Sequence, residues 1–152
     1  MKKSIFLLIL VCSSTVLFSQ KIPSNYDGKL AKILNADEYG MKKYVFCLLK
    51  TGSNTTASKE ETQKLFEGHM ANINKLALEG KLVVAGPFMK NDRKYRGIYI
   101  FNANSIDEAK QFVATDPAVQ SNLLEAELTL WYGSAALQET LKIHDKIAKT
   151  KI

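Results

Sequence analysis

The chain has 152 residues, of which 46% are hydrophobic, and a formal net charge of +6 at pH 7. This length suits one domain of ordinary size and leaves little room for a second. The basic excess is spread out, because residues 43–133 carry eleven basic and ten acidic side chains. Nucleic-acid binding requires clustered Lys and Arg along one face, so the composition argues against a nucleic-acid partner.

Residues 1–19 have the pattern of a secretory signal peptide. Two lysines precede an apolar run from Ile5 to Cys12, and small residues follow before Gln20. The run is shorter than the ~20 apolar residues of a membrane span, so we expect a secreted or periplasmic protein without a stable membrane anchor. A lipoprotein anchor at Cys12 is the less favoured alternative, because the bulky Val11 precedes it.

Cysteine usage and motif content exclude several kinds of site. After cleavage of the signal peptide, Cys47 would be the only cysteine, so no internal disulfide could form. The chain has no phosphate-binding glycine loop and no dinucleotide fingerprint. His144 and Asp145 are adjacent, but a tight metal site needs three or four converging ligands. We therefore expect neither a cofactor nor a metal.

Hydrophobic periodicity, turn residues and capping patterns predict the order of elements after the signal peptide. Ser58 with Glu61, and Ser105 with Glu108, form two capping-box patterns, and Asp116-Pro117 resembles a third helix start. The predicted elements are a leader arm at 20–42 with one or two helical turns, strands at 43–50, 81–88, 95–101 and 126–132, helices at 59–79, 106–115 and from 117, and a basic helical tail at 134–152.

The order β-α-β-β-α-β predicts an α+β, ferredoxin-like domain, in which two helices cover one face of an antiparallel sheet. Residues 44–49 and 82–85 are consecutively apolar instead of alternating. Such runs are typical of strands that are buried on both faces. A partner sheet is the simplest cover for the second face, so we expect a homodimer.

Three separated motifs resemble the YCII-related (YciI-like) family over about residues 43–133. They are Glu67-Gly68-His69, the stretch from Leu82 to Phe88, and Asp116-Pro117-Ala118-Val119. The resemblance implies subunits that pair as a dimeric α/β barrel and a His–Asp dyad formed by His69 and Asp116. It also implies a small-molecule ligand, since one member is similar to a dehydrochlorinase of hydroxylated aromatics.

Both dyad candidates also have structural interpretations. His69 lies in or beside the apolar stripe of its helix. A purely structural histidine that hydrogen-bonds a backbone carbonyl would lie in the same place. Asp before Pro is a common N-cap, which contributes ~1 kcal/mol to stability. The two functions of Asp116 are compatible, because a capping carboxylate could also hold one ring nitrogen of His69.

Gly86, Pro87 and Phe88 end the second predicted strand and are the candidate substrate-binding residues. In the functional interpretation, Gly86 lets a substrate approach the backbone while Pro87 and Phe88 form a wall. The alternative is a strand terminator or an edge bulge. The sole tryptophan, Trp131, is more simply explained as a core or dimer contact than as a ligand platform.

Two functional hypotheses follow. In the first, the protein is a small exported enzyme without a cofactor, and His69 is a general acid or base oriented by Asp116. It would catalyse elimination, isomerisation or hydrolysis of a small cyclic or aromatic compound. In the second, the same domain is a non-catalytic small-molecule-binding or dimerisation module.

The signal-peptide interpretation predicts that the mature chain begins near Gln20 and is soluble. N-terminal sequencing of protein recovered from the periplasm or medium of a bacterial host measures this start directly. Recovery of the protein in the membrane fraction with Met1 intact would contradict the prediction.

Overall fold

A computed structural model describes residues 22–150, so the predicted signal peptide and Cys12 lie outside the described residues. The order of the elements agrees with the sequence-based prediction, and the third predicted strand has the expected bounds. The elements are α1 (Gly28–Ile33), β1 (Met41–Thr51), α2 (Lys59–Leu78), β2 (Leu82–Pro87), β3 (Tyr95–Phe101), α3 (Ile106–Val113), α4 (Pro117–Gln120), β4 (Leu124–Ser134), the 3-10 helix η1 (Ala135–Glu139) and α5 (Thr140–Ile147).

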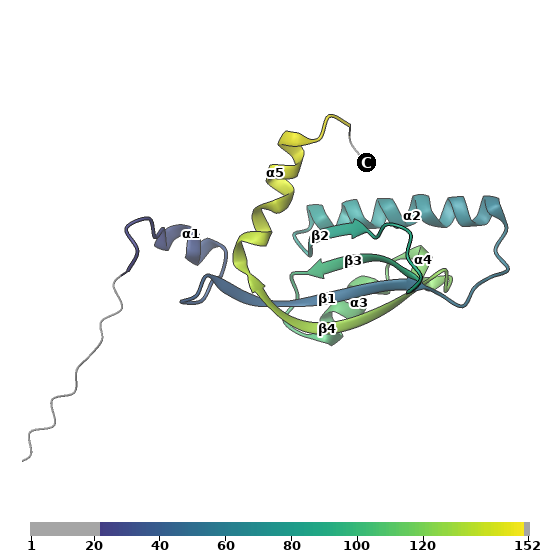
Figure 1. The fold of residues 1–152 in the computed structure, drawn as a ribbon, viewed down its shortest axis with the longest axis horizontal. Helices are drawn as coiled ribbons and strands as arrows, with labels where there is room; N and C mark the ends of the chain where they lie inside the picture. The colour runs from purple at the N-terminus through teal and green to yellow at the C-terminus, as the bar shows by residue number, and fades with distance from the viewer. Residues whose placement is uncertain (1–21, 151–152) are drawn as a thin grey trace, which may run out of the picture.

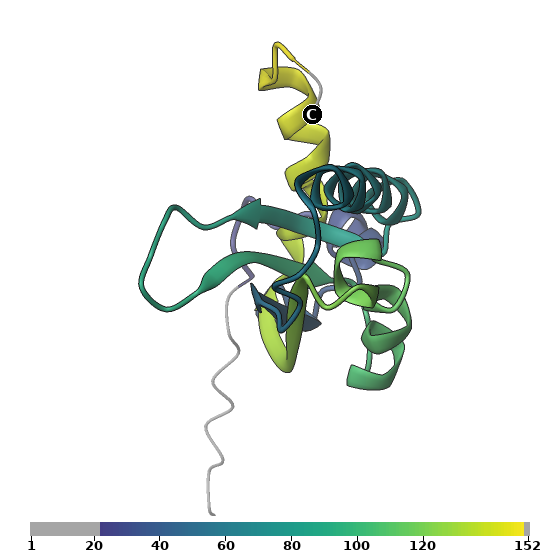
Figure 2. The same cartoon turned by 90° about the vertical axis from the view of Figure 1, so that its right-hand side faces the viewer.

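The four strands form one antiparallel sheet in the order β2-β3-β1-β4, which is the ferredoxin-like topology. Helices α2, α3 and α4 lie on the same side of this sheet (Figure 2). Strands β1 and β4 are paired over their whole length, from Met41 opposite Ser134 to Thr51 opposite Leu124. Both are longer than predicted, since the pairing of the two strands with each other continues beyond the runs that their sequence patterns marked.

The helix starts follow from capping side chains. Ser58 and Glu61 form a complete capping box at α2, as predicted. At α3 only half of the predicted box is present, because the carboxylate of Glu108 accepts from the backbone N–H of Asn104 instead of that of Ser105. Asp116 caps α4 and Pro117 is its first residue, in agreement with the prediction.

The main core lies between the sheet and α2 and α3. Val45, Cys47 and Leu49 point from β1 toward these helices, together with Tyr99 and Phe101 from β3. Leu76 of α2 and Phe112 of α3 complete the contact from the helical side. Burial of these apolar side chains is the main stabilising contribution to the domain.

The second face of the sheet is only partly covered within one chain. Tyr44, Val83 and Ile100 are buried there, and Leu137 of η1 packs against them. Phe46 and Leu48, further along β1, keep part of their surface exposed. The expectation of strands buried on both faces therefore holds for one end of the sheet, while the other end is open in the single chain.

The predicted leader arm and tail project from the body of the domain (Figure 1). Neither α1 nor α5 contains a buried residue. The arm is tied back where the side chain of Gln138 donates to the backbone carbonyl of Leu34 and the hydroxyl of Tyr132 donates to Asp37. Among residues 22–150, no helix combines the length and apolar character that a membrane span requires.

Two glycines on neighbouring strands give a matched test of packing at the β2–β3 edge. A Cβ atom on Gly97 would lie 2.8 Å from the carbonyl oxygen of Gly86, whereas one on Gly86 would meet nothing within 4 Å. We expect Gly97→Ala to lower the free energy of unfolding by about 1–3 kcal/mol through overpacking. Gly86→Ala should be neutral or stabilise by up to ~1 kcal/mol. Urea unfolding midpoints measure both, and equal midpoints for the two variants would contradict this packing.

Candidate functional site

His69 lies on the face of α2 that is turned toward the sheet. It is 9% exposed, and the ring of Phe66, one turn earlier, contacts its imidazole edge-on with centroids 5.6 Å apart. The position in the apolar stripe that the sequence spacing predicted is confirmed. A histidine in this position needs a polar partner, because an unpaired buried imidazole would lose its hydrogen bonds to water.

Asp116 is that partner, and it is 0% exposed. Its Oδ1 atom accepts the backbone N–H of Ala118 at 2.9 Å, which is the N-cap bond of α4. Its Oδ2 atom lies 2.8 Å from Nδ1 of His69. A single carboxylate therefore both starts a helix and contacts the histidine, as the sequence analysis suggested.

The contact fixes the hydrogen-bonding roles of the imidazole. An ionised carboxylate can only accept, so Nδ1 of His69 carries the proton and donates it to Asp116. The other nitrogen, Nε2, is then left to accept or give a proton. The predicted contact between His69 and Asp116 is confirmed, and its use in catalysis stays a prediction.

A close approach between α2 and α4 brings the two residues together. Gly68 precedes His69 and Pro117 follows Asp116, and a Cβ atom on Gly68 would lie 3.0 Å from Cγ of Pro117. Only a residue without a side chain lets the proline ring pack so closely on the helix. Gly68 therefore makes a packing contact with Pro117 that brings α2 and the start of α4 together.

Tyr99 of β3 is a member of the site that the sequence analysis missed. Its hydroxyl donates to Oδ2 of Asp116 at 3.1 Å, and its ring stacks against the imidazole with centroids 6.0 Å apart. Burial, together with the neighbouring charge of Asp116, raises the pKa of Tyr99, so its hydroxyl stays protonated. The available signal was a tyrosine at an inward-facing position of a buried strand, where a hydroxyl requires a partner.

Cys47 lies opposite Tyr99 on the neighbouring strand and is fully buried. Burial, with a smaller contribution from the negative charge of Asp116, raises the pKa of its thiol to about 12. A thiol that remains protonated is a poor nucleophile. Cys47 is therefore a small core residue of the sheet.

A second polar contact joins the same two segments one turn further along α2. The hydroxyl of Thr115 lies 2.8 Å from Oδ1 of the buried Asn72. Thr115 directly precedes Asp116, and Asn72 follows His69 by three residues. The two contacts together fix the start of α4 against α2.

The three predicted substrate-binding residues lie at the edge of the sheet. Gly86, Pro87 and Phe88 are exposed, and no contact between them and the dyad is among the described interactions. Strand pairing places Pro87 opposite Gly97 and the exposed Ala85 opposite Tyr99. The exposed end of β2 therefore begins beside the tyrosine that contacts His69, and its role in substrate binding stays a prediction.

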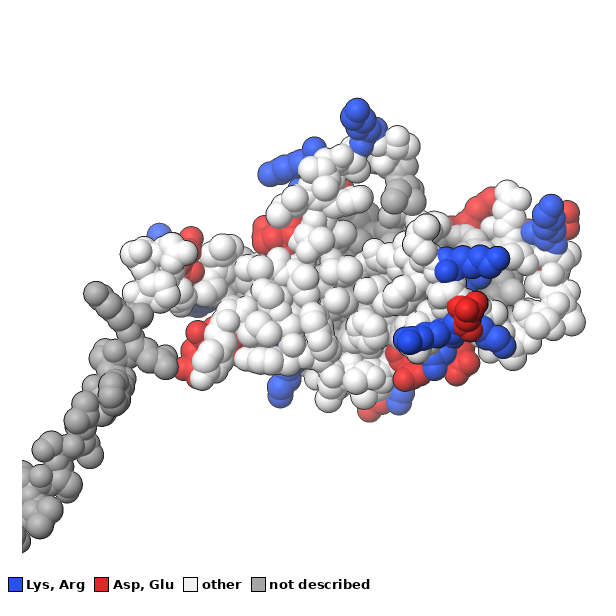
Figure 3. Space-filling view, in the orientation of Figure 1, with Lys and Arg blue, Asp and Glu red and all other residues white. Residues whose placement is uncertain are grey.

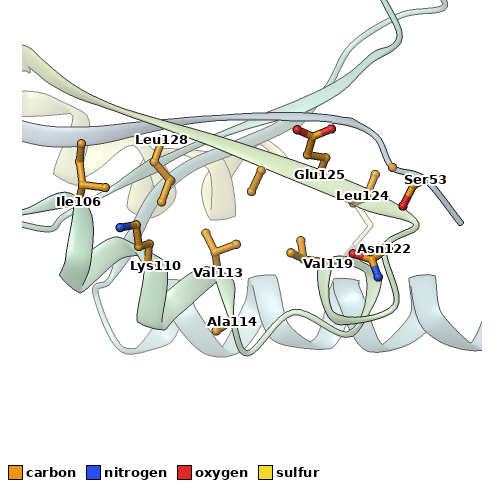
Figure 4. A pocket seen from close by; sticks show the side chains of 12 residues that line it. Ser53, Ile106, Lys110, Val113, Ala114, Val119, Asn122, Leu124, Glu125 and Leu128 are labelled. Carbon is orange, nitrogen blue, oxygen red and sulfur yellow. The ribbon is translucent and has the colours of Figure 1, made fainter.

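Two surface cavities lie close to the site without including the dyad. The first, of about 560 Å³, lies between α3 and β4 and is lined mainly by apolar residues such as Val113, Val119 and Leu128 (Figure 4). The second, of about 720 Å³, is lined by Gly68 and Pro117, the chain neighbours of His69 and Asp116. A ligand could contact His69 only through the 9% of its surface that is exposed.

In the part of the chain that is described, neither Trp131 and His144 nor the acidic pair on β4 forms a site. Glu125 and Glu127 are exposed on one face of β4, where Glu127 pairs with Lys50. Trp131 packs against Tyr44 with centroids 6.0 Å apart. His144 is exposed on α5. Within residues 22–150, no group of three or more His, Cys, Asp or Glu side chains is placed to hold a metal ion.

The fold and the site define a class of protein, a ferredoxin-like α+β domain with a buried histidine–aspartate pair between its sheet and its long helix. Residues 44–131 match the YCII-related domain, and because this match spans more than half of the chain, the protein belongs to that family. The match also lies within the boundaries that the three sequence motifs indicated.

Several solved structures resemble this chain, and one of them is a dehydrochlorinase. The solved structure of 5-chloro-2-hydroxyhydroquinone dehydrochlorinase from Burkholderia phenoliruptrix, in complex with 2,5-dihydroxybenzoquinone, is 23% identical in sequence to this chain. The alignment covers 57% of this chain and 92% of that chain, with a TM-score of 0.42. No match was found among curated proteins.

The contacts of Asp116 predict its contribution to stability. Asp116→Ala would leave the N–H of Ala118, the ring of His69 and the hydroxyl of Tyr99 without their acceptor, and should cost about 3–5 kcal/mol. Asp116→Asn keeps an oxygen for the cap and should cost less. Asp27, the exposed N-cap of α1, is the matched control, because Asp27→Ala removes a cap alone at about 1 kcal/mol. Equal losses in Asp116→Ala and Asp27→Ala, measured by urea unfolding, would contradict this assignment.

Proposed function

We propose that this protein is a small exported enzyme that uses His69 and Asp116 for general acid–base chemistry on a small cyclic or aromatic compound. The reaction is an elimination, an isomerisation or a hydrolysis. The observation that carries the proposal is the 2.8 Å contact between Nδ1 of His69 and Oδ2 of the fully buried Asp116. Membership in the YCII-related family supports it.

The geometry suits proton transfer through one defined nitrogen. Asp116 holds the Nδ1–H of His69, so Nε2 is the atom that exchanges a proton with the substrate. The carboxylate also stabilises the imidazolium that forms when Nε2 accepts a proton. Because both side chains come from helices packed on the sheet, the dyad is held rigidly before a substrate arrives.

The substrate approaches from the β2 edge in this proposal. Ala85 and Pro87 lie on the helix-side face of the sheet by their pairing with Tyr99 and Gly97, and both are exposed. This edge therefore offers open surface next to the residues that contact His69. Gly86, Pro87 and Phe88 would line the path to Nε2.

Replacing His69 distinguishes an enzyme from a binding module. We expect His69→Ala to lower turnover by about 10²–10⁴-fold while ligand affinity changes little, because general acid–base catalysis contributes that range. A panel of lactones, cyclic ketones and halogenated hydroxyaromatics, followed by NMR, covers the three reaction classes. A matched control is His144→Ala, since His144 is exposed on α5, away from the dyad. Lost affinity without any measurable turnover in the wild type would favour a binding module.

The Pro87→Ala variant tests the substrate path in the same assay. Pro87 is exposed and lies on the helix-side face by its pairing with Gly97, so loss of its ring would remove part of the wall of the path. We expect a raised KM with little change in the unfolding midpoint. An unchanged KM would remove Pro87 from the proposed path.

We also propose a homodimer that covers the open end of the second sheet face. Phe46, Leu48 and Ile98 are partly exposed on that face, and Trp131 at its β4 edge is 39% exposed. Uncharged side chains occupy the middle of the molecule in the view of Figure 3, while charged ones gather toward its ends. On β4 the same face carries Glu125 and Glu127, so the apolar part of the proposed interface lies on β1 and β3. Partly exposed apolar side chains that cluster in this way are typical of an interface between subunits.

Light scattering at graded concentrations tests this assembly. We expect a dimer in the wild type and a shift toward monomer in Leu48→Lys, because the substitution places a charge on the proposed interface. Lys142→Ala, at an exposed position of α5, is a control for a change of charge alone. A fully folded wild-type monomer at all concentrations would contradict the homodimer.

A further inference from the structure

Tyr99 shares one acceptor atom with the histidine of the dyad. Its hydroxyl and Nδ1 of His69 lie 3.1 Å and 2.8 Å from the same oxygen, Oδ2 of Asp116. The hydroxyl oxygen also lies 3.3 Å from Nδ1 and 3.4 Å from Nε2, so it is nearly equidistant from the two ring nitrogens. A tyrosine hydroxyl has a single proton, and the hydrogen bond to Asp116 uses it.

Two donors that share one carboxylate oxygen compete for its negative charge. Each hydrogen bond is then weaker than it would be if the other donor were absent, although the buried carboxylate as a whole is better satisfied. The other oxygen, Oδ1, is already occupied by the N–H of Ala118. Asp116 therefore has no unoccupied oxygen to which it could turn away from Tyr99.

We propose that Tyr99 is a positioning residue that limits the strength of the bond between His69 and Asp116 while its ring holds the imidazole in place. This inference rests on the proposed function for its catalytic consequence, because an imidazolium held too tightly by Asp116 would release its proton slowly. Its structural part depends only on the contacts of Tyr99. The two parts are tested separately.

The resonance of the Nδ1–H proton of His69 measures the strength of its bond to Asp116. Proton NMR of the full mature chain detects it, and His69→Gln, which lacks the proton, assigns it. We expect the resonance to move downfield in Tyr99→Phe, because Oδ2 then serves one donor only. Tyr44→Phe is the matched control, since Tyr44 is equally buried but lies on the opposite face, where its hydroxyl donates to backbone carbonyls. No shift, or an upfield shift, in Tyr99→Phe would overturn the proposal.

A second substitution keeps the test decisive if Tyr99→Phe does not fold. Site-specific replacement of Tyr99 by 3-fluorotyrosine preserves the shape of the side chain and makes its hydroxyl a stronger donor. The Nδ1–H resonance of His69 should then move upfield, in the direction opposite to that in Tyr99→Phe. An unchanged resonance would overturn the proposal.

Kinetics test the catalytic part. With any substrate that the wild type turns over, Tyr99→Phe should lower kcat by roughly tenfold, because the imidazolium would be held more tightly. KM should change little, because Tyr99 acts through His69 and not on the substrate. If the NMR shift is found but the wild type shows no turnover, the proposed function fails and the role of Tyr99 stands. If turnover is found and Tyr99→Phe changes neither kcat nor the resonance, the role of Tyr99 fails and the proposed function stands.

Discussion

The buried carboxylate of Asp116 is the constraint around which the site is organised. A charge with no exposed surface is tolerated only if surrounding donors replace the water that it loses. Here the donors come from three elements, namely His69 of α2, Tyr99 of β3 and the first turn of α4. Because α2, β3 and the start of α4 all donate hydrogen bonds to this one side chain, it fixes their positions relative to one another.

In our proposal, this arrangement joins stability to function at the same atoms. The N-cap bond that starts α4 also orients the carboxylate, so the local folding of a four-residue helix fixes the position of the partner of His69. The packing of Pro117 on Gly68 sets the distance between the two helices. A site built on packed elements in this way would need little rearrangement for the proton transfer that we propose.

The two faces of the sheet are covered to different extents within one chain. The face toward α2 and α3 contains the core, together with Tyr99 and Cys47. On the other face η1 covers Tyr44, Val83 and Ile100, while Phe46 and Leu48 remain partly exposed. In our proposal the first face holds the chemistry and the second holds the partner subunit, so assembly would leave the dyad unobstructed.

Local features of the sequence determined the order of the elements, the capping of α2 and α4 and the place of His69 on an apolar stripe, because each depends on residues within one or two helical turns. The resemblance of the motifs also implied that Asp116 pairs with His69, but the spacing of 47 positions could not by itself place the two side chains in contact. That contact, the participation of Tyr99 and the open end of the second face depend on strand register and on the packing of α2 against α4. Only the tertiary structure decided them, because no local pattern encodes the distance between side chains that the fold brings together.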